Sequence, residues 1–455
     1  MTAPRCPAWI LLALGGLILI LTFAALSLHV PGSIWVGSVP RKDAVVALML
    51  ASGALYAGAV ALVIRLPAMP NLLAPVLAIA VALRVALLLA PPFMSSDIYR
   101  YVWDGRVQAA GINPYVHVPA DAALTKLRDS AIYPRINRAD YAHTIYPPAA
   151  QVIFAVVGRV SDSVTATKLS MLLLEAGGIM AALRMLSLAK MPMARILIYS
   201  WNPLVLWAVA GDGHIDGAMI GLLGLAMWAA ARQRGALAGA LLGGAILTKF
   251  LPIAILPALW RRWDWKLPTS CAAVIVVLYA CYAGAGWQVL GFLPNYTHEE
   301  GFSGSGFWLL AVLGYFARLP SWAGTAYIVA AACMLAVAAQ AMVFGVQPRT
   351  DADRIRLIGD RVGVLAAATT AAMSAHYPWY FSWLALPCCF SVRPTVLWLS
   401  VAPMLLYSDP WHDEILLPTL VYVPTAGLAV MDIFNLWHAP HQQSAQGLLH
   451  VDHAG

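Results

Sequence analysis

Four polar side chains recur at helical spacing just after an apolar run: Asp97, Tyr101, Asp104 and Gln108. Residues three and four apart share a face of an α-helix, so these groups line up, and Arg100 reaches Asp97 or Asp104. Carboxylates placed in this way can exchange a proton or pair with a cation. A simpler interpretation is a solvated helix at a membrane surface, whose acids only pair with the neighbouring arginines.

Basic and aromatic residues continue along the same polar segment. Arg135, Arg138, His143 and Tyr146 lie between Pro134 and the pair Pro147-Pro148. A guanidinium binds phosphate oxygens in a forked geometry and aromatic rings stack on the apolar faces of sugars, so this pattern is typical of a site for a phosphate or a sugar. Any exposed aromatic and basic loop at an interface has a similar composition. Residues 149–160 are too few to cross a bilayer.

Three further polar clusters interrupt apolar segments, at residues 211–217, 376–381 and 409–414. They contain His214, Asp216, His376 and Trp379, and we expect all three clusters on one side of a membrane, where they suggest a shared polar cavity. A zinc site built from His214, Asp216, His376 and His412 is not favoured, because no two of these lie at ligand spacing on one helix.

Two cations lie inside apolar segments. Arg84 stands about six residues before the end of its predicted helix, and Lys249 lies between two short ones. Either could extend its charge to the interface. A cation without a nearby partner in the sequence also fits an anion, and we expect a lipid phosphate.

The elements that position these residues are predicted to be membrane helices. The chain has 455 residues, of which 61% are hydrophobic and 11% are charged, a composition that excludes a soluble enzyme. We expect an all-α polytopic protein with about 11–14 transmembrane helices, some of them broken, and amphipathic helices in the first large outer loop. Apolar runs lie at 8–28, 44–64, 71–90, 164–189, 194–210, 214–231, 235–248, 250–260, 268–285, 322–346, 362–376, 378–391, 395–408 and 415–437.

The domain organisation follows from these runs. We expect a single transmembrane domain at 1–437, in which 91–163 forms the outer loop, and a polar cytoplasmic tail at 438–455. With the N-terminus inside, the basic turns near Arg232, Arg261, Arg354 and Arg393 fall in the cytoplasm, as the positive-inside rule requires. The six cysteines lie in or beside apolar segments and indicate no disulfide-bonded outer domain.

Several motifs together resemble a known family. These are Ser-Ser-Asp-Ile-Tyr-Arg-Tyr-Val-Trp-Asp-Gly-Arg at 95–106, Gly-Ile-Asn-Pro-Tyr at 111–115, Tyr-Pro-Pro at 146–148, Gly-His-Ile-Asp at 213–216, Lys249 with Pro252, and His-Tyr-Pro-Trp-Tyr at 376–380. From about Arg84 to Phe381 the chain resembles bacterial membrane glycosyltransferases of the GT-C fold, particularly the mannosyltransferases that use polyprenyl-phosphate mannose.

The resemblance implies a reaction and roles for residues. Asp97 would be the general base on an acceptor hydroxyl, and mannose would pass from a polyprenyl phosphate to a lipid-linked or glycan acceptor with inversion, on the extracytoplasmic side of the bacterial plasma membrane. No cofactor or nucleic acid is expected. A divalent metal is less favoured, because Ser95 and Ser96 precede Asp97 where many family members carry a second acid. The expected substrate-binding residues are Arg84, Arg100, Tyr101, Asp104, Arg138, Tyr146, His214, Asp216, Lys249, His376 and Trp379.

Other functions remain open at this level. A transporter or flippase of lipid-linked sugars would also present basic residues toward lipid, but the halves of the chain show no internal repeat of the kind common in secondary transporters. An oligosaccharide ligase or polymerase would need a wider acceptor groove, and a membrane scaffold would need no buried cations.

Overall fold

The computed structural model describes residues 8–28, 39–65, 72–299, 306–345, 348–408 and 415–449. Within these residues every regular element is a helix and no strand is present, so the all-α prediction is confirmed. The longer helices outside the polar loop are α1 (Ala8–Ser27), α2 (Val39–Arg65), α3 (Leu73–Leu89), α6 (Val164–Leu188), α9 (Asp216–Ala231), α10 (Gly235–Ile246), α12 (Lys266–Ala280), α15 (Ala323–Phe344), α16 (Asp351–Ala372) and α19 (Leu416–Leu449).

Shorter helical pieces connect and cover the long helices. Between 91 and 163 lie α4 (Asp97–Ala109), η2 (Ala122–Leu127), η3 (Tyr133–Arg135) and α5 (Pro148–Val160). The others are η4 (Met193–Ile196), α7 (Leu197–Ser200), α8 (Pro203–Val205), η5 (Leu206–Gly211), η6 (Leu251–Ile255), α11 (Leu256–Leu259), η7 (Ala283–Leu290), α13 (Leu293–Glu299), α14 (Trp308–Phe316), η8 (Pro378–Leu384), α17 (Ala385–Cys388), α18 (Pro394–Leu399) and η9 (Ala402–Tyr407).

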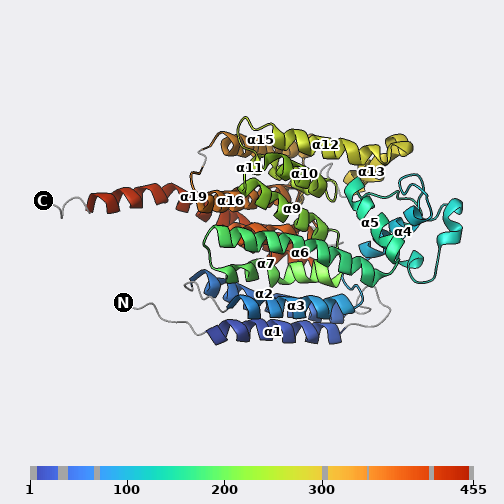
Figure 1. Cartoon of the computed structure of the whole chain (residues 1–455), viewed down its shortest axis with the longest axis horizontal. Helices are drawn as coiled ribbons and strands as arrows, with labels where there is room; N and C mark the ends of the chain where they lie inside the picture. Colours follow the sequence, from blue (N-terminus) through green and yellow to red (C-terminus); the bar gives the residue numbers. More distant parts are fainter. Residues whose placement is uncertain are drawn as a thin grey trace.

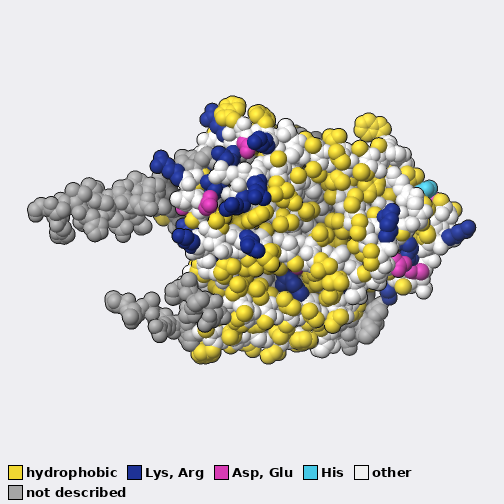
Figure 2. All heavy atoms as spheres, in the orientation of Figure 1, with side chains coloured by type: hydrophobic (Ala, Val, Ile, Leu, Met, Phe, Trp, Pro, Cys, Tyr) yellow, Lys and Arg dark blue, Asp and Glu magenta, His cyan; other side chains and the backbone are white. Residues whose placement is uncertain are grey.

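The long helices run side by side and the polar loop covers one end of the bundle (Figure 1). Helices α4 and α5 lie at that end, beside α13, whereas α19 extends outward from the opposite end. Between the two ends the visible face is largely hydrophobic, and Lys and Arg side chains gather toward the ends (Figure 2). An apolar belt between two polar ends is what a bilayer requires of a protein that crosses it.

By length and composition, five described helices could cross a membrane, and up to seven if each of two bent pairs is one span. The bent pairs are Met193–Ser200 with Pro203–Gly211, at 54°, and Lys266–Ala280 with Ala283–Tyr296, at 111°. Five further apolar helices have only 10–17 residues. The predicted broken helices are therefore present, and the chain is a polytopic membrane protein. Proline at N1 or N2 of α8, η6, η8 and α18 accounts for several of the breaks.

The helix predicted from the spacing of Asp97, Tyr101, Asp104 and Gln108 is confirmed as α4, but it does not lie on a solvated surface. Ten of its thirteen residues are buried. Helix α5 packs directly on α4 where Gly105 meets Gly158, and an added Cβ at Gly105 would lie 2.5 Å from the carbonyl oxygen of Phe154. Because these glycines let the two backbones meet, the face that carries Asp104 and Gln108 turns into protein and away from water.

The opposite end of the bundle carries the basic turns. Arg354 donates to the carbonyl of Ala231 at 3.2 Å, and Arg261 donates to the side chain of Gln233 at 2.7 Å. Arg393 pairs with Asp360 of α16. The turns that the sequence assigns to a single side of the membrane are therefore neighbours in space. Helix α19 continues to Leu449, past the predicted end of the last span at 437.

Candidate active site

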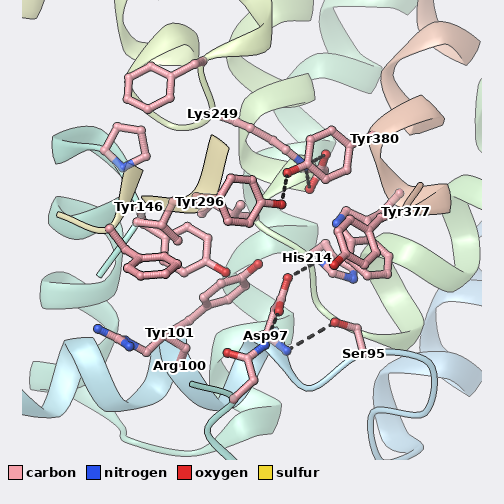
Figure 3. A pocket seen from close by; sticks show the side chains of 18 of the residues that line it. Ser95, Asp97, Arg100, Tyr101, Tyr146, His214, Lys249, Tyr296, Tyr377 and Tyr380 are labelled. Carbon is pink, nitrogen blue, oxygen red and sulfur yellow. Dashed lines mark hydrogen bonds and ion pairs between the residues drawn. The ribbon is translucent and has the colours of Figure 1, made fainter. Parts of the chain in front are cut away.

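A cavity of about 260 Å³ lies where the polar loop meets the end of the bundle. Figure 3 shows Asp97 on one side of the cavity, between Tyr101 and His214, and Lys249 reaching in from the other side beside Tyr380. Segments far apart in the sequence supply the wall, namely residues 94–101, 137–147, 214–216, 248–251, 292–296 and 373–380.

Asp97 is the first residue of α4, and its carboxylate enters the cavity. The side chain is 21% exposed. Its Oδ1 accepts a hydrogen bond from Asn137 Nδ2 at 3.1 Å, and its Oδ2 lies 3.7 Å from His214 Nδ1. The backbone N–H of Asp97 donates to Ser95 Oγ at 3.2 Å. A carboxylate in the first turn of a helix also interacts favourably with the helix dipole.

The surroundings of Asp97 alter its acidity in opposing ways. Burial raises the pKa of the carboxyl group above its usual value, and the nearby charge of Asp216 acts in the same direction. The hydrogen bond from Asn137 and the charges of Lys249 and Arg138 lower the pKa. The net shift is upward, which makes Asp97 a stronger proton acceptor than an exposed aspartate.

Aromatic rings form one wall of the cavity. The ring of His214 stacks on Trp379, with centroids 4.3 Å apart, and Trp379 stacks on Tyr377 at 4.8 Å. His214 Nε2 is buried and has no hydrogen-bond partner among the described residues. A stacked aromatic wall next to a carboxylate is suited to the apolar face of a sugar ring.

Lys249 and Asp216 form a buried ion pair on the wall opposite Asp97. Lys249 Nζ lies 2.7 Å and 2.9 Å from the two carboxylate oxygens, and it lies 3.9 Å from the ring centroid of Tyr380. The Tyr380 hydroxyl in turn contacts that of Tyr296 at 3.0 Å. The lysine side chain is 15% exposed and lines the cavity, while Asp216 is 1% exposed behind it.

Arg100 and Arg138 add positive charge near Asp97. Arg100 Nε lies 2.8 Å from Asp104 Oδ1, and its Nη1 donates to the carbonyl of Ala142. Arg138 has a positive φ of 54°, and its Nε lies 2.8 Å from Glu299 Oε2. Both arginines line the cavity, so their charges act on it although each already has an anionic partner.

Tyr101 and Tyr146 line the part of the cavity next to Asp97. Their rings meet edge to face at 4.8 Å, and Tyr101 also stacks on Phe154 at 4.7 Å. This packing fixes both rings on the cavity wall.

Three residues expected at the site lie outside the cavity wall. Arg84 has no partner nearby in the sequence, but the fold pairs it with Glu175, which lies 91 residues away. Asp104 is 1% exposed and accepts from Thr144 and Gln151 as well as Arg100. His376 Nε2 contacts the carbonyl of Gly306 at 3.0 Å. The cluster at 409–414 lies outside the described residues.

Some of the residues that line the cavity were not predicted from the sequence, among them Asn137, Tyr296, Tyr377 and Tyr380. Asn137 stands between two selected positions, and its contact with Asp97 depends on the fold of the loop. Tyr377 and Tyr380 belong to the cluster at 376–381, but only His376 and Trp379 were selected from it. Tyr296 follows an asparagine in an Asn-Tyr-Thr sequence that gives no sign of a binding role.

No group of three or more His, Cys, Asp or Glu side chains in the described part of the chain has an arrangement that could hold a metal ion. Asp97, Asp216 and His214 instead interact with Asn137, Lys249 and Trp379. The residues that line the cavity thus include the two carboxylates Asp97 and Asp216, three cations and a stacked aromatic wall.

Comparison with known proteins gives one match. The family model for the N-terminal domain of α-(1→6)-mannopyranosyltransferases matches residues 7–264, which is more than half of the chain. The matched region contains Asp97, Asn137, Arg138, His214, Asp216 and Lys249. No curated protein and no solved structure matches the chain.

Proposed function

Since the chain belongs to the α-(1→6)-mannopyranosyltransferase family and is a membrane glycosyltransferase, we propose that it transfers mannose from a polyprenyl-phosphate donor to a hydroxyl of a lipid-linked or glycan acceptor. The observation that carries this proposal is the cavity in which the Asp97 carboxylate faces Lys249, Arg100 and Arg138. It combines a proton acceptor with the positive charge that a phosphate needs. The GT-C assignment of the fold belongs to the same proposal.

The reaction requires two bond changes at one carbon. Asp97 takes the proton of the acceptor hydroxyl, and the oxygen bonds to the anomeric carbon of mannose. The bond from that carbon to the phosphate oxygen breaks, and the electron pair leaves with the polyprenyl phosphate. Direct displacement converts a β-linked donor into an α-linked product, and the family name suggests a (1→6) linkage for it.

Different residues of the cavity would bind the phosphate, the mannose ring and the acceptor. Lys249, Arg100 and Arg138 would stabilise the negative charge of the departing phosphate, because oriented cations in a site shielded from water are effective stabilisers of developing charge. The stack of His214 and Trp379 would hold the mannose ring. Tyr101 and Tyr146 form a rigid floor on which the acceptor could rest. Asp216 would keep Lys249 oriented toward the cavity.

We further propose that 1–437 form one domain and that the site opens on the extracytoplasmic face of a bacterial plasma membrane. The first statement is supported by the cavity wall, which uses Phe292, Tyr296, Tyr377 and Tyr380 beyond the matched N-terminal region. The second is supported by the basic turns at the opposite end of the bundle, where the positive-inside rule places the cytoplasm. The tail at 438–455 would then be cytoplasmic.

The family match favours an enzyme over the transporter or flippase alternative. The direct test is transfer by the purified protein from polyprenyl-phosphate mannose to an octyl mannoside, with the corresponding glucose and arabinose donors in parallel. We expect Asp97→Asn to lower kcat by about 10²–10⁴-fold without a comparable change in KM. Asp162→Asn is the control, since this acid lies in the same loop with a side chain that is 58% exposed. Full activity of a correctly inserted Asp97→Asn protein would refute the role of Asp97 as base.

A further inference from the structure

Two buried charges outside the cavity hold the chain segment that leads to Asp97. Asp212 is 1% exposed, and its Oδ1 accepts hydrogen bonds from the backbone N–H groups of Phe93, at 2.7 Å, and Met94, at 2.9 Å. Lys168 is fully buried, and its Nζ donates to the carbonyls of Leu87, at 2.7 Å, and Ala90, at 2.6 Å. The turn between α3 and α4 is therefore fixed through its donors and its acceptors by two oppositely charged side chains.

The local backbone brings Asp212 against this turn. Asp212 directly follows η5, which is a π-helical segment, at the end of the bent pair with a 54° angle. Segments of π-helix inside helices are frequently found at functional sites. Gly213 has a φ of +70°, and a Cβ there would lie 2.4 Å from Ile98 Cδ1. The turn at 211–214 thus contacts the first turn of α4, where Asp97 lies.

We propose that Asp212 is a positioning residue for the transfer reaction, which acts by fixing the start of α4 and thereby the Asp97 carboxylate. This proposal rests on the proposed role of Asp97 as base. Asp212 is not among the residues that line the cavity, so it would act without contacting the substrate. Its effect runs through the N–H groups of Phe93 and Met94, which lie four and three residues before Asp97.

Glu175 provides a matched control. It is also 1% exposed and also holds a buried partner, Arg84, with Nη2–Oε1 at 2.6 Å. Its partners are Arg84 and Tyr199, neither of which lines the cavity. A substitution at Glu175 therefore disturbs a buried ionic network of the bundle without loosening the turn before Asp97.

The experiment uses the full-length protein in lipid nanodiscs, with polyprenyl-phosphate mannose as donor and octyl mannoside as acceptor. Hydrogen exchange of peptides that cover 91–96 is measured beside kcat and KM. For Asp212→Ala we expect faster exchange in this segment and a fall in kcat of about 10²-fold, as small misplacements of reacting groups can produce, with an unchanged donor KM. Asp212→Asn keeps Oδ1 as acceptor but loses its charge, so we expect a fall of about 3- to 10-fold. Glu175→Gln should leave both the exchange of 91–96 and kcat close to wild type.

The outcomes separate this proposal from the proposed function. Unchanged exchange of 91–96 in Asp212→Ala, or a kcat that matches Glu175→Gln, overturns the positioning role. If Asp212→Ala does not insert into the membrane, Asp212→Asn alone tests the proposal. The positioning role is then overturned if the kcat of Asp212→Asn is unchanged, or if its KM rises as its kcat falls. Activity that survives Asp97→Asn refutes the base itself, whereas loss in Asp97→Asn together with a wild-type Asp212→Ala refutes only the positioning.

Discussion

Two buried cations of this protein, Arg84 and Lys249, look alike in the sequence but have different surroundings in the structure: one is enclosed by helices and the other borders the cavity. Arg84 and Lys249 both interrupt apolar segments. The guanidinium of Arg84 contacts both oxygens of Glu175, at 2.6 Å and 2.9 Å, and the carbonyl of Ser200 at 2.8 Å. The ammonium of Lys249 contacts Asp216 and the face of Tyr380, and it borders the cavity.

This difference in surroundings indicates whether a buried cation contributes to stability or to ligand binding. Arg84 has its hydrogen bonds to Glu175 and backbone carbonyls at the junction of α3, α6 and α7, so it joins helices. Lys249 contacts Asp216 and the ring of Tyr380 but also borders the cavity, so its charge can act on a ligand. A cation at the wall of a cavity is therefore a candidate for binding, whereas one enclosed by helices is a candidate for stability.

The largest expected effect is on stability, from Arg84→Ala. This change leaves the Glu175 carboxylate buried without its partner, and such a loss costs about 3–5 kcal/mol of the free energy of unfolding. We expect a clearly lower Tm in lipid nanodiscs, with kcat within about threefold of wild type at temperatures where the variant is folded. The paired change Arg84→Met with Glu175→Leu should recover most of the Tm. A large loss of kcat in the folded Arg84→Ala protein would contradict the assignment of Arg84 to stability alone.

Lys249→Met should have the next largest effect, on catalysis. Loss of a cation that stabilises the leaving phosphate should lower kcat by about 10²–10³-fold. Because Asp216 would remain unpaired, the double variant Lys249→Met with Asp216→Asn is needed to separate stability from activity. We expect it to recover Tm and to stay inactive. Recovery of activity in the double variant would show that Lys249, like Arg84, contributes to stability and not to binding of the phosphate.

The pH dependence of kcat/KM should show the raised pKa of Asp97. Below that pKa the carboxyl group is protonated and cannot accept a proton, so the rate should fall by about tenfold for each pH unit. The fall should begin at a higher pH than for an aspartate of ordinary acidity. Asn137→Leu removes a hydrogen bond that lowers the pKa, so the acidic limb should move to still higher pH. If the acidic limb of Asn137→Leu moves to lower pH or does not move, the hydrogen bond from Asn137 does not lower the pKa of Asp97.

The smallest effect is expected for Glu299→Gln. Glu299 pairs with Arg138 where the side chains are 35% and 24% exposed, and partly exposed pairs contribute about 0–1 kcal/mol. We expect a Tm close to wild type and a donor KM that changes by only a few-fold, since the phosphate no longer competes with a carboxylate for Arg138. A Tm drop as large as that of Arg84→Ala would show that solvent exposure does not separate the ion pairs of this protein.

The helical class and many site residues could be predicted from the sequence, because both depend on local composition. Apolar runs near 20 residues indicate membrane helices, and the helical spacing of Asp97, Tyr101, Asp104 and Gln108 predicted α4. Asn137 and Tyr296 could not be predicted, because each reaches the cavity through a contact with a distant residue: Asn137 contacts Asp97 across 40 residues, and Tyr296 contacts Tyr380 across 84 residues. The burial of Asp104 depends on the contact of Gly105 with Gly158, which no local pattern reveals.

Hydrophobicity and charge are properties of single residues, so the order of residues along the chain was enough to identify a membrane protein whose acids and cations are concentrated in a few polar segments. Only the tertiary structure decided which charges face each other. It paired Arg84 with Glu175 across 91 residues and Lys249 with Asp216 across 33. It also left Asp97 at the cavity. The physical reason is that the cost of burying a charge depends on its partners and on its access to water, and both are set by the packing of helices that are distant in the chain.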